Sequence, residues 1–237
     1  MKRPKMIIFD AGRTLIDYTN MDTLGDVQAL MPYIVENPRN LTAEQINDFA
    51  WEVFGQFEAA RKSLFEVHEQ TILRLVYDTL GIKFSIPMEE VEAIMWRCHP
   101  GIVPVTGAAE MLAALNEMGI ETAVISNLDF SGYLLQERLD QIFPHNRFRF
   151  VVASSDYGIR KPSAMIFQAG ITRSGYTPDE IWYVGDKVRV DVDGSRACGM
   201  VPVLYKSSRN SYSSFPEELL VVEDYSELIT ILKDCTT

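Results

Sequence analysis

The chain has 237 residues, 47% of them hydrophobic and 23% charged, which suits one large globular domain or a core with a small inserted domain. Its formal net charge of −11 argues against nucleic acid and against an anionic membrane surface as partners. Three scattered cysteines with no Cys-x-x-Cys pair are typical of reduced thiols, and we expect a cytoplasmic protein. Asp10 interrupts the first apolar run, and no stretch approaches the length of a membrane span.

Short apolar runs along the chain are predicted to form buried strands, because they are rich in β-branched or aromatic residues and end at polar or small residues. They span 6–9, 122–125, 148–153, 181–184 and 201–205, with an expected edge strand at 219–222. Helical spacing between them predicts helices over 108–118, 132–141, 163–174, 192–197 and 226–232. This alternation predicts an α/β fold with a doubly wound parallel sheet, whose active site lies at the carboxyl ends of the strands.

Residues 16–100 interrupt the alternation. Four segments there have amphipathic helical spacing without a convincing strand pattern: 22–34, 42–64, 67–80 and 88–98. Thr42 and Gln45 have the spacing of a capping box. We therefore predict a Rossmann-like core made of 1–15 and 101–237, and an all-helical cap domain of 16–100 that lies over the strand ends.

Chemistry-bearing residues follow four of the predicted strands. The first strand ends in Asp10-Ala11-Gly12-Arg13-Thr14, and the second ends in Ser126-Asn127. Lys161-Pro162 comes after the third strand, and Gly185-Asp186, with Asp191 five residues later, ends the fourth. Because the carboxyl ends of parallel strands meet at one edge of a sheet, we expect these four elements to form one site.

The order and spacing of the four elements resembles the haloacid dehalogenase-like (HAD) superfamily of aspartyl-nucleophile hydrolases, in the subgroup with a helical cap inserted after the first motif. The resemblance covers nearly the whole chain. Each motif alone is weak, but two strings in the right order are specific together. These are Gly158-x-x-Lys161-Pro162-x-x-x-Ile166-Phe167 and Gly185-Asp186-x-x-x-x-Asp191.

A carboxylate attacks a phosphoryl group only when the charge repulsion is neutralised, and a divalent cation held by carboxylates does this. The resemblance implies that Asp10 is the nucleophile and that Asp10 and Asp186 bind Mg²⁺ directly. It places Asp191 close to the metal and makes the backbone carbonyl of Gly12 a further ligand. The expected cofactor is Mg²⁺, and the expected partner is a small phosphorylated metabolite bound by a monomer or homodimer.

The remaining site residues are assigned to the phosphate. The resemblance implies that Ser126 and Asn127 hold the phosphoryl oxygens with side-chain and backbone groups. Lys161 is expected to pair with Asp10 and with the phosphate as a point charge. Thr14 is expected to fix the loop beside the phosphate. The predicted reaction is transfer of the phosphoryl group to Asp10, followed by hydrolysis of the aspartyl-phosphate.

Gly12 stands where the superfamily most often has a second aspartate, which protonates the leaving group and later activates water. Losing a general acid–base typically costs on the order of 10²–10⁴-fold in rate. Arg13 and Lys187 also depart from the residues often seen, which are glycine and serine. We therefore expect a phosphatase that is slow on alkyl phosphates and relatively better on aryl or acyl phosphates.

Three alternatives remain open at this point. A catalytically weak protein that keeps the pocket for phosphate binding or regulation explains the missing acid. Haloacid dehalogenases also lack the second aspartate and need no metal, although their fourth motif does not normally carry Gly-Asp. Phosphonoacetaldehyde hydrolases use a cap lysine as a Schiff base, for which Lys62 and Lys83 are the candidates.

Side chains of the predicted cap are assigned to structural positions. Five charged or polar residues with the reach to touch a substrate are expected on solvated helix faces instead: Arg61, Lys62, Glu66, His68 and Glu69. An aromatic series is expected in the core of the cap: Phe49, Trp51, Phe54 and Phe57.

Overall fold

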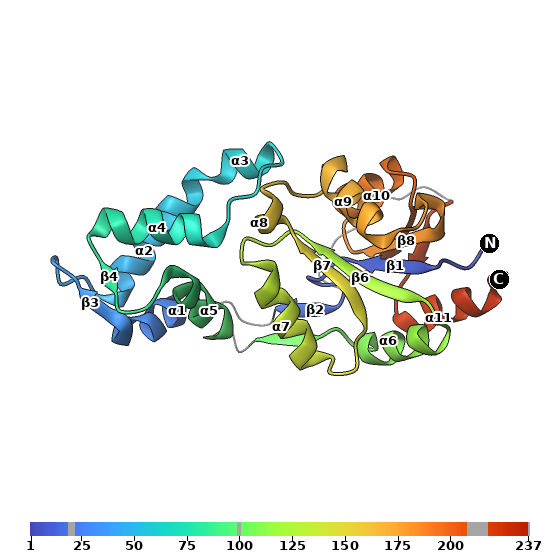
Figure 1. Ribbon diagram of the computed structural model, residues 1–237, viewed down its shortest axis with the longest axis horizontal. Helices are drawn as coiled ribbons and strands as arrows, with labels where there is room; N and C mark the ends of the chain where they lie inside the picture. Colours follow the sequence, from blue (N-terminus) through green and yellow to red (C-terminus); the bar gives the residue numbers. More distant parts are fainter. Residues whose placement is uncertain (19–21, 99–100, 208–217, 237) are drawn as a thin grey trace.

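A six-stranded parallel sheet forms the centre of the computed structural model, which describes residues 1–18, 22–98, 101–207 and 218–236 (Figure 1). Its strand order is β10-β9-β8-β1-β6-β7, and all of the pairings are parallel. The strands are β1 (Met6–Phe9), β6 (Glu121–Ser126), β7 (Phe148–Ala153), β8 (Ile181–Gly185), β9 (Val201–Tyr205) and β10 (Leu220–Val222). The predicted α/β class is confirmed, with each predicted strand within a residue of its observed bounds.

Helices cover both faces of this sheet because successive strand residues point to opposite sides. In β1, Ile7 and Phe9 belong to one apolar cluster, whereas Met6 and Ile8 belong to another. The first cluster is covered by α6 (Ala108–Glu117), α7 (Gly132–Ile142) and α11 (Tyr225–Asp234). The second is covered by α9 (Ala164–Ser174), which is followed along the chain by α10 (Asp193–Ala197). The sheet is therefore doubly wound, as predicted.

β1 lies at the point where the strand order reverses. The chain leaves β1 toward β6 and β7 on one side and returns to β8, β9 and β10 on the other. Two neighbouring connections therefore depart in opposite directions and open a crevice beyond the carboxyl end of β1. Asp10 is the first residue after that end, and its N–H donates to the Val184 carbonyl of β8 at 2.9 Å.

The segment between β1 and α6 forms a separate helical layer beside the sheet (Figure 1). It contains α1 (Thr23–Leu30), α2 (Ala43–Gln56), α3 (Glu58–Lys62), α4 (Glu69–Leu80) and α5 (Met88–Cys98). These helices have an apolar core of their own, which includes Leu30, Ile46, Val76 and Val91. The predicted capping box is present, with the Thr42 side chain accepting from the Gln45 N–H and the Gln45 side chain from the Thr42 N–H.

The segment is mostly rather than entirely helical, so the prediction of an all-helical cap needs correction. β3 (Ile34–Glu36) and β4 (Lys83–Phe84) form a short antiparallel pair at its outer end. Pro32 lies in a 3₁₀ turn that ends the first predicted helix before β3, since proline lacks the N–H that a helix interior needs. Each strand is too short to show an alternating pattern in the sequence.

A second antiparallel pair joins this helical layer to the core. β2 (Ile16–Tyr18) runs beside β5 (Ile102–Pro104), with Tyr18 opposite Ile102. Residues 19–21 and 99–100 lie outside the described residues. The predicted domain boundaries at 15/16 and 100/101 stay a prediction. The β2–β5 pair connects the inserted helices to the core.

The inserted helices also contact the core away from the β2–β5 pair. The Glu66 N–H donates to the Gly158 carbonyl at 3.0 Å, and the Arg160 N–H donates to the Leu64 carbonyl at 3.0 Å. The Trp96 indole donates to the Leu134 carbonyl of α7 at 3.0 Å. The first two of these hydrogen bonds link the insertion to the segment just before Lys161.

Two further observations concern the whole described chain. Among its residues, every helix is too short or too polar to cross a lipid bilayer. Cys98, Cys198 and Cys235 are all free thiols.

Candidate active site

The loop after β1 is folded tightly around one carbonyl group. The Ala11 carbonyl accepts from the N–H groups of Thr14, Leu15 and Ile16 at 3.3, 2.8 and 3.0 Å. Arg13 has a left-handed backbone with φ of 63°, which costs a non-glycine residue roughly 1–2 kcal/mol. This conformation gives a physical reason for the glycine that the resembled superfamily often has there. The turn points Asp10, which is 5% exposed, into a cavity.

Lys161 lies at the buried base of this cavity and joins three side chains. Its Nζ lies 2.7 Å from Asp10 Oδ1, 2.7 Å from Asp191 Oδ1 and 2.7 Å from the Tyr183 hydroxyl. Burial alone lowers the pKa of the ammonium group, but the carboxylates of Asp10 and Asp191 outweigh burial and hold the pKa well above its usual value. Lys161 is therefore a cation beside Asp10, whereas its predicted contact with a phosphate stays a prediction.

Two neighbours hold the Lys161 chain in place. The Asn127 side chain donates to the Lys161 carbonyl at 3.0 Å and accepts from the Lys161 N–H at 2.7 Å. The Tyr183 hydroxyl donates to the Ile125 carbonyl at 2.9 Å, so its lone pairs face the ammonium. The Asn127 side-chain amide therefore holds the Lys161 backbone in place. The backbone N–H of Asn127 is the group of this residue that remains for a phosphate contact.

Asp10, Asp186 and Asp191 form a buried acidic cluster in which one carboxylate oxygen of each lies within 4.8 Å of the others. The Lys187 N–H donates to Asp191 Oδ2 at 3.0 Å and orients that side chain. Lys161 pairs with two of the three carboxyl groups, Asp10 and Asp191, so acidic groups outnumber the basic one in this cluster. Hard oxygen donors of this kind suit Mg²⁺, so the residues present fit the expected metal.

The cavity around this cluster has a volume of about 410 Å³. Among its lining residues are Asp10, Gly12, Arg13, Ser126, Asn127, Lys161, Lys187 and Asp191. The structure thus brings together all the predicted phosphate-binding residues and three of the predicted metal ligands. Asp186 is fully buried and joins them through the acidic cluster rather than the cavity wall.

Thr14 is placed differently from the other predicted site residues. It is fully buried, it is not among the residues that line the cavity, and its backbone carbonyl accepts a hydrogen bond from the Tyr225 hydroxyl of α11. Its hydroxyl has no hydrogen-bond partner among the described residues. The structure shows Thr14 anchoring the loop, whereas its predicted place beside the phosphate stays a prediction.

Tyr18 is a lining residue that the sequence did not indicate. A Cβ atom built on Gly12 lies 3.1 Å from Tyr18 Cε2 and 3.8 Å from the Tyr18 hydroxyl. Burial, with the negative charges of Asp10 and Asp129, raises the pKa of this hydroxyl, so it is a neutral hydrogen-bond donor. The tyrosine from β2 therefore occupies the space where the missing second aspartate would extend.

The inserted segment differs from its predicted surface in several places. Glu66 is buried, accepts from the Ser154 hydroxyl at 2.7 Å and pairs with Arg61 and Arg160 at 3.4 Å each. His68 caps α4 and lies 3.1 Å from the Ser131 hydroxyl. The expectation of solvated faces is wrong for Glu66 and Glu69, because the connection between α3 and α4 and the first residue of α4 contact core residues at Ser154, Gly158 and Asp129.

Lys62 fits its predicted surface position. Its side chain is 73% exposed and pairs with Glu58, and the Lys83 side chain is 67% exposed and pairs with Glu36. Neither lysine lines the cavity that holds Asp10. The structure therefore gives no support to a Schiff-base lysine of the phosphonoacetaldehyde hydrolase type.

A carboxylate and a buried lysine at the switch point of a doubly wound parallel sheet, with a mostly helical insertion after the first strand, are typical of Rossmann-like hydrolases that use an aspartate. The chain belongs to the haloacid dehalogenase-like hydrolase family, whose pattern matches residues 7–204. It is therefore an enzyme of the hydrolase class, and the resemblance on which the site was predicted is confirmed.

Individual relatives extend over nearly the whole chain. The chain is 25% identical to the glyceraldehyde 3-phosphate phosphatase of Methanothermobacter thermautotrophicus over 243 residues, which cover 96% of this chain and 99% of that protein. The crystal structure of 2-haloacid dehalogenase from Pseudomonas syringae shares the fold with a TM-score of 0.68 at 19% identity, covering 97% of this chain and 98% of that one. The crystal structure of a HAD phosphatase from Thermococcus onnurineus also shares the fold. Its TM-score is 0.65 at 18% identity, and the match covers 100% of both chains.

Proposed function

We propose that the protein is a Mg²⁺-dependent phosphatase of a small phosphorylated metabolite, with Asp10 as nucleophile. The observation that carries this proposal is the grouping of Asp10, Asp186 and Asp191 around buried Lys161 at the end of β1. A relative over nearly the full length that is named a phosphatase supports the same reaction class. We also propose that the protein acts in the cytoplasm as a monomer or homodimer.

The roles of the side chains follow from their contacts. Lys161 bonds Asp10 Oδ1, which leaves Oδ2 as the oxygen that attacks phosphorus. The bond from phosphorus to the leaving oxygen breaks as the bond to Asp10 Oδ2 forms, and with Gly12 at position 12 the leaving oxygen takes its proton from solvent. A water molecule then attacks phosphorus and gives up a proton to solvent, while the bond from phosphorus to Asp10 Oδ2 breaks, so that inorganic phosphate leaves and the Asp10 carboxylate is restored. Ser126 and the backbone N–H of Asn127 hold the phosphoryl oxygens, and the Lys161 ammonium offsets the charge that Asp10 and the phosphate bring together.

Mg²⁺ would be held by Asp10, Asp186, Asp191 and the Gly12 carbonyl. When bound, it supplies positive charge that neutralises the repulsion between the nucleophile and the phosphate. Asp191 also contacts Lys161 and the Lys187 N–H, so its carboxylate is already oriented. The glycine at position 12 still provides a carbonyl ligand, because that role needs no side chain.

A substrate panel tests the proposed reaction. We expect Mg²⁺-dependent hydrolysis with aryl and acyl phosphates turned over about 10²-fold faster than alkyl phosphates, because their leaving groups need less protonation. The measurement is phosphate release with Mg²⁺ and with EDTA. Full activity in EDTA would contradict the proposal, and chloride release from a 2-chloroacid without Mg²⁺ would assign the protein to the dehalogenases instead.

A catalytically weak phosphate-binding protein is the second candidate, and Gly12 beside Tyr18 is the observation that favours it. In that case the pocket binds phosphate with Mg²⁺ but releases no product. Calorimetric titration with inorganic phosphate and Mg²⁺, followed by the same substrate panel, separates the two. Binding without turnover of any ester supports the second candidate.

Gly12→Asp should raise the rate of alkyl phosphate hydrolysis when the Tyr18 side chain is also replaced by a smaller one. A side chain at position 12 would begin 3.1 Å from Tyr18 Cε2, so Gly12→Asp alone displaces the Tyr18 ring. We expect a gain of about 10²-fold or more in kcat for Gly12→Asp combined with Tyr18→Ser, and a smaller gain for Gly12→Asp alone.

Tyr18→Ser alone is the matched control, since it opens the space without adding an acid. The comparison uses kcat with Mg²⁺, and Tm establishes that each variant is folded. A folded double variant without any gain would show that protonation of the leaving group does not limit the rate.

A further inference from the structure

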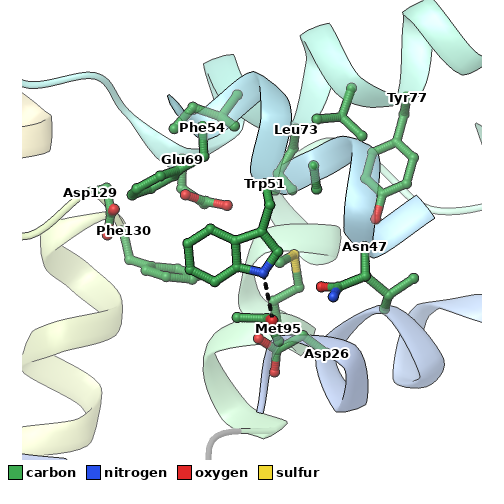
Figure 2. A pocket seen from close by; sticks show the side chains of 15 residues that line it. Asp26, Asn47, Trp51, Phe54, Glu69, Leu73, Tyr77, Met95, Asp129 and Phe130 are labelled. Carbon is green, nitrogen blue, oxygen red and sulfur yellow. Dashed lines mark hydrogen bonds between the residues drawn. The ribbon is translucent and has the colours of Figure 1, made fainter. Parts of the chain in front are cut away.

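A second cavity lies among the inserted helices, and no described residue that lines it also lines the cavity that holds Asp10 and Lys161. We call it the insertion cavity; it is bounded by α1, α2, α4 and α5 and by residues 129–130 of the core (Figure 2). Its volume is about 160 Å³, close to that of an engineered apolar cavity that accommodates benzene. Most of its wall is aliphatic or aromatic, including Trp51, Phe54 and Phe130.

Glu69 places a buried carboxylate in this apolar wall. The residue is 8% exposed, and its N–H donates to the Asp129 carbonyl at 2.8 Å. Its carboxylate makes no hydrogen bond or ion pair with the described residues, and Figure 2 shows it directed toward Trp51. An unpaired charge in such surroundings is unfavourable unless a partner reaches it. Burial, reinforced by Asp129 and Glu92, raises the pKa of this carboxyl well above its usual value.

The other titratable groups that line the cavity are also acidic. Asp26 also lines the cavity and is 2% exposed, and Figure 2 shows it on the other side of Trp51 from Glu69. Asp129 also lines the cavity, and its carboxylate is paired with Arg61 at 3.3 Å. Among the described lining residues there is no lysine, arginine or histidine. The wall of the cavity therefore carries acidic groups on two sides and no basic one.

Aromatic rings complete the chemistry of the cavity. Trp51 is 54% exposed, unlike the core position predicted for it, and its indole donates to the Thr23 hydroxyl at 3.2 Å. Trp51 and Phe54 meet edge to face, with ring centroids 5.6 Å apart. The Arg61 guanidinium already lies 3.9 Å from the Phe54 centroid. Aromatic faces combined with carboxylates recognise organic ammonium groups, whereas Mg²⁺ requires oxygen ligands on most sides.

We propose that the insertion cavity is a binding site for a small organic ammonium ion, with Glu69 and Asp26 as counter-charges and Trp51 and Phe130 as aromatic walls. This site stands on its own residues and does not depend on the proposed phosphatase reaction. An ammonium group that enters past Trp51 provides the Glu69 carboxylate with the partner that the described part of the chain does not supply.

Choline and its neutral isostere 3,3-dimethyl-1-butanol test the proposal on the unmodified chain. Both have the same shape, and only choline carries charge. We expect choline to bind about tenfold or more tightly than the alcohol by calorimetry. Choline should also change the tryptophan fluorescence, and Trp51→Phe should remove most of that change because Trp51 is the tryptophan whose side chain lines the cavity. Equal affinity for the two probes, or no binding of either, would overturn the proposal.

Substitutions assign the binding to this cavity. We expect Glu69→Gln to weaken choline binding about tenfold or more, and Asp26→Asn to weaken it as well. Glu52→Gln is the matched control, because it removes the same charge from an exposed position of α2. Choline binding that is unchanged in folded Glu69→Gln contradicts the assignment. If Glu69→Gln does not fold, the test rests on the affinity difference between choline and the alcohol and on the choline affinity of Asp26→Asn. Equal affinity for the two probes, or unchanged choline binding by folded Asp26→Asn, then contradicts the assignment.

Discussion

Asp10→Asn should lower phosphatase activity by about 10⁴-fold or more, because an amide oxygen does not form the aspartyl-phosphate. The substitution keeps the size of the side chain, and Lys161 retains its contacts with Asp191 and Tyr183 at 2.7 Å each. The loss is therefore expected in kcat, with the fold intact. The measurement is hydrolysis of an aryl phosphate with Mg²⁺, together with mass spectrometry of the quenched enzyme to detect a phosphoryl group on Asp10.

Asp193→Asn is the matched control for this prediction. Asp193 is exposed in the first turn of α10, two residues from Asp191, and it lies outside the acidic cluster. The same chemical change there should leave the rate within about twofold. Comparable rates for Asp10→Asn and the unmodified enzyme would rule out Asp10 as the nucleophile, whatever the Mg²⁺ dependence.

Lys161→Met should destabilise the fold as well as lower activity. The side chain is buried, and its removal leaves Asp10 and Asp191 without their shared cation. Breaking a buried ion pair from one side costs about 3–5 kcal/mol, which corresponds to a fall in Tm of about 6–20 °C for a chain of this length. Thermal unfolding followed by circular dichroism measures the change.

Mg²⁺ should restore part of this lost stability. A cation that binds the folded state stabilises it by mass action, and the three carboxylates of the variant lack the competing ammonium. The Tm increase on adding Mg²⁺ is therefore expected to be larger for Lys161→Met than for the unmodified protein. Lys187→Met, at an exposed position, should change Tm by only a few degrees. If both variants unfold at the same temperature, the Lys161 ion pairs contribute little to stability.

The main features of the fold were predictable because they depend on local patterns. Buried parallel strands read as short apolar runs, so β1, β7 and β9 were predicted at their observed bounds. The side chains at the strand ends were predictable for the same reason, since a parallel sheet brings its carboxyl ends to one edge. That is why Asp10, Ser126, Lys161, Asp186 and Asp191 were predicted as one site from positions far apart in the chain.

The inserted segment was less predictable because tertiary packing overrides its local patterns. Amphipathic spacing located its helices but not β3 and β4, which are too short for a detectable period. The same spacing did not distinguish solvent from a neighbouring domain. Glu66 and Glu69 were thus predicted to be surface residues, although both are buried in the folded chain. Trp51 read as a core residue, although it is more than half exposed at the insertion cavity.

The sequence by itself determined which side chains stand at the strand ends, and from them it predicted an Asp10 nucleophile, a metal-binding set and Gly12 in place of a second acid. Only the tertiary structure decided what surrounds that chemistry. It placed Tyr18 beside Gly12, committed the Asn127 amide to Lys161 and set the Glu69 carboxylate in the wall of an apolar cavity. These outcomes depend on contacts between separate elements, whose distances follow from packing and not from the spacing of residues along the chain.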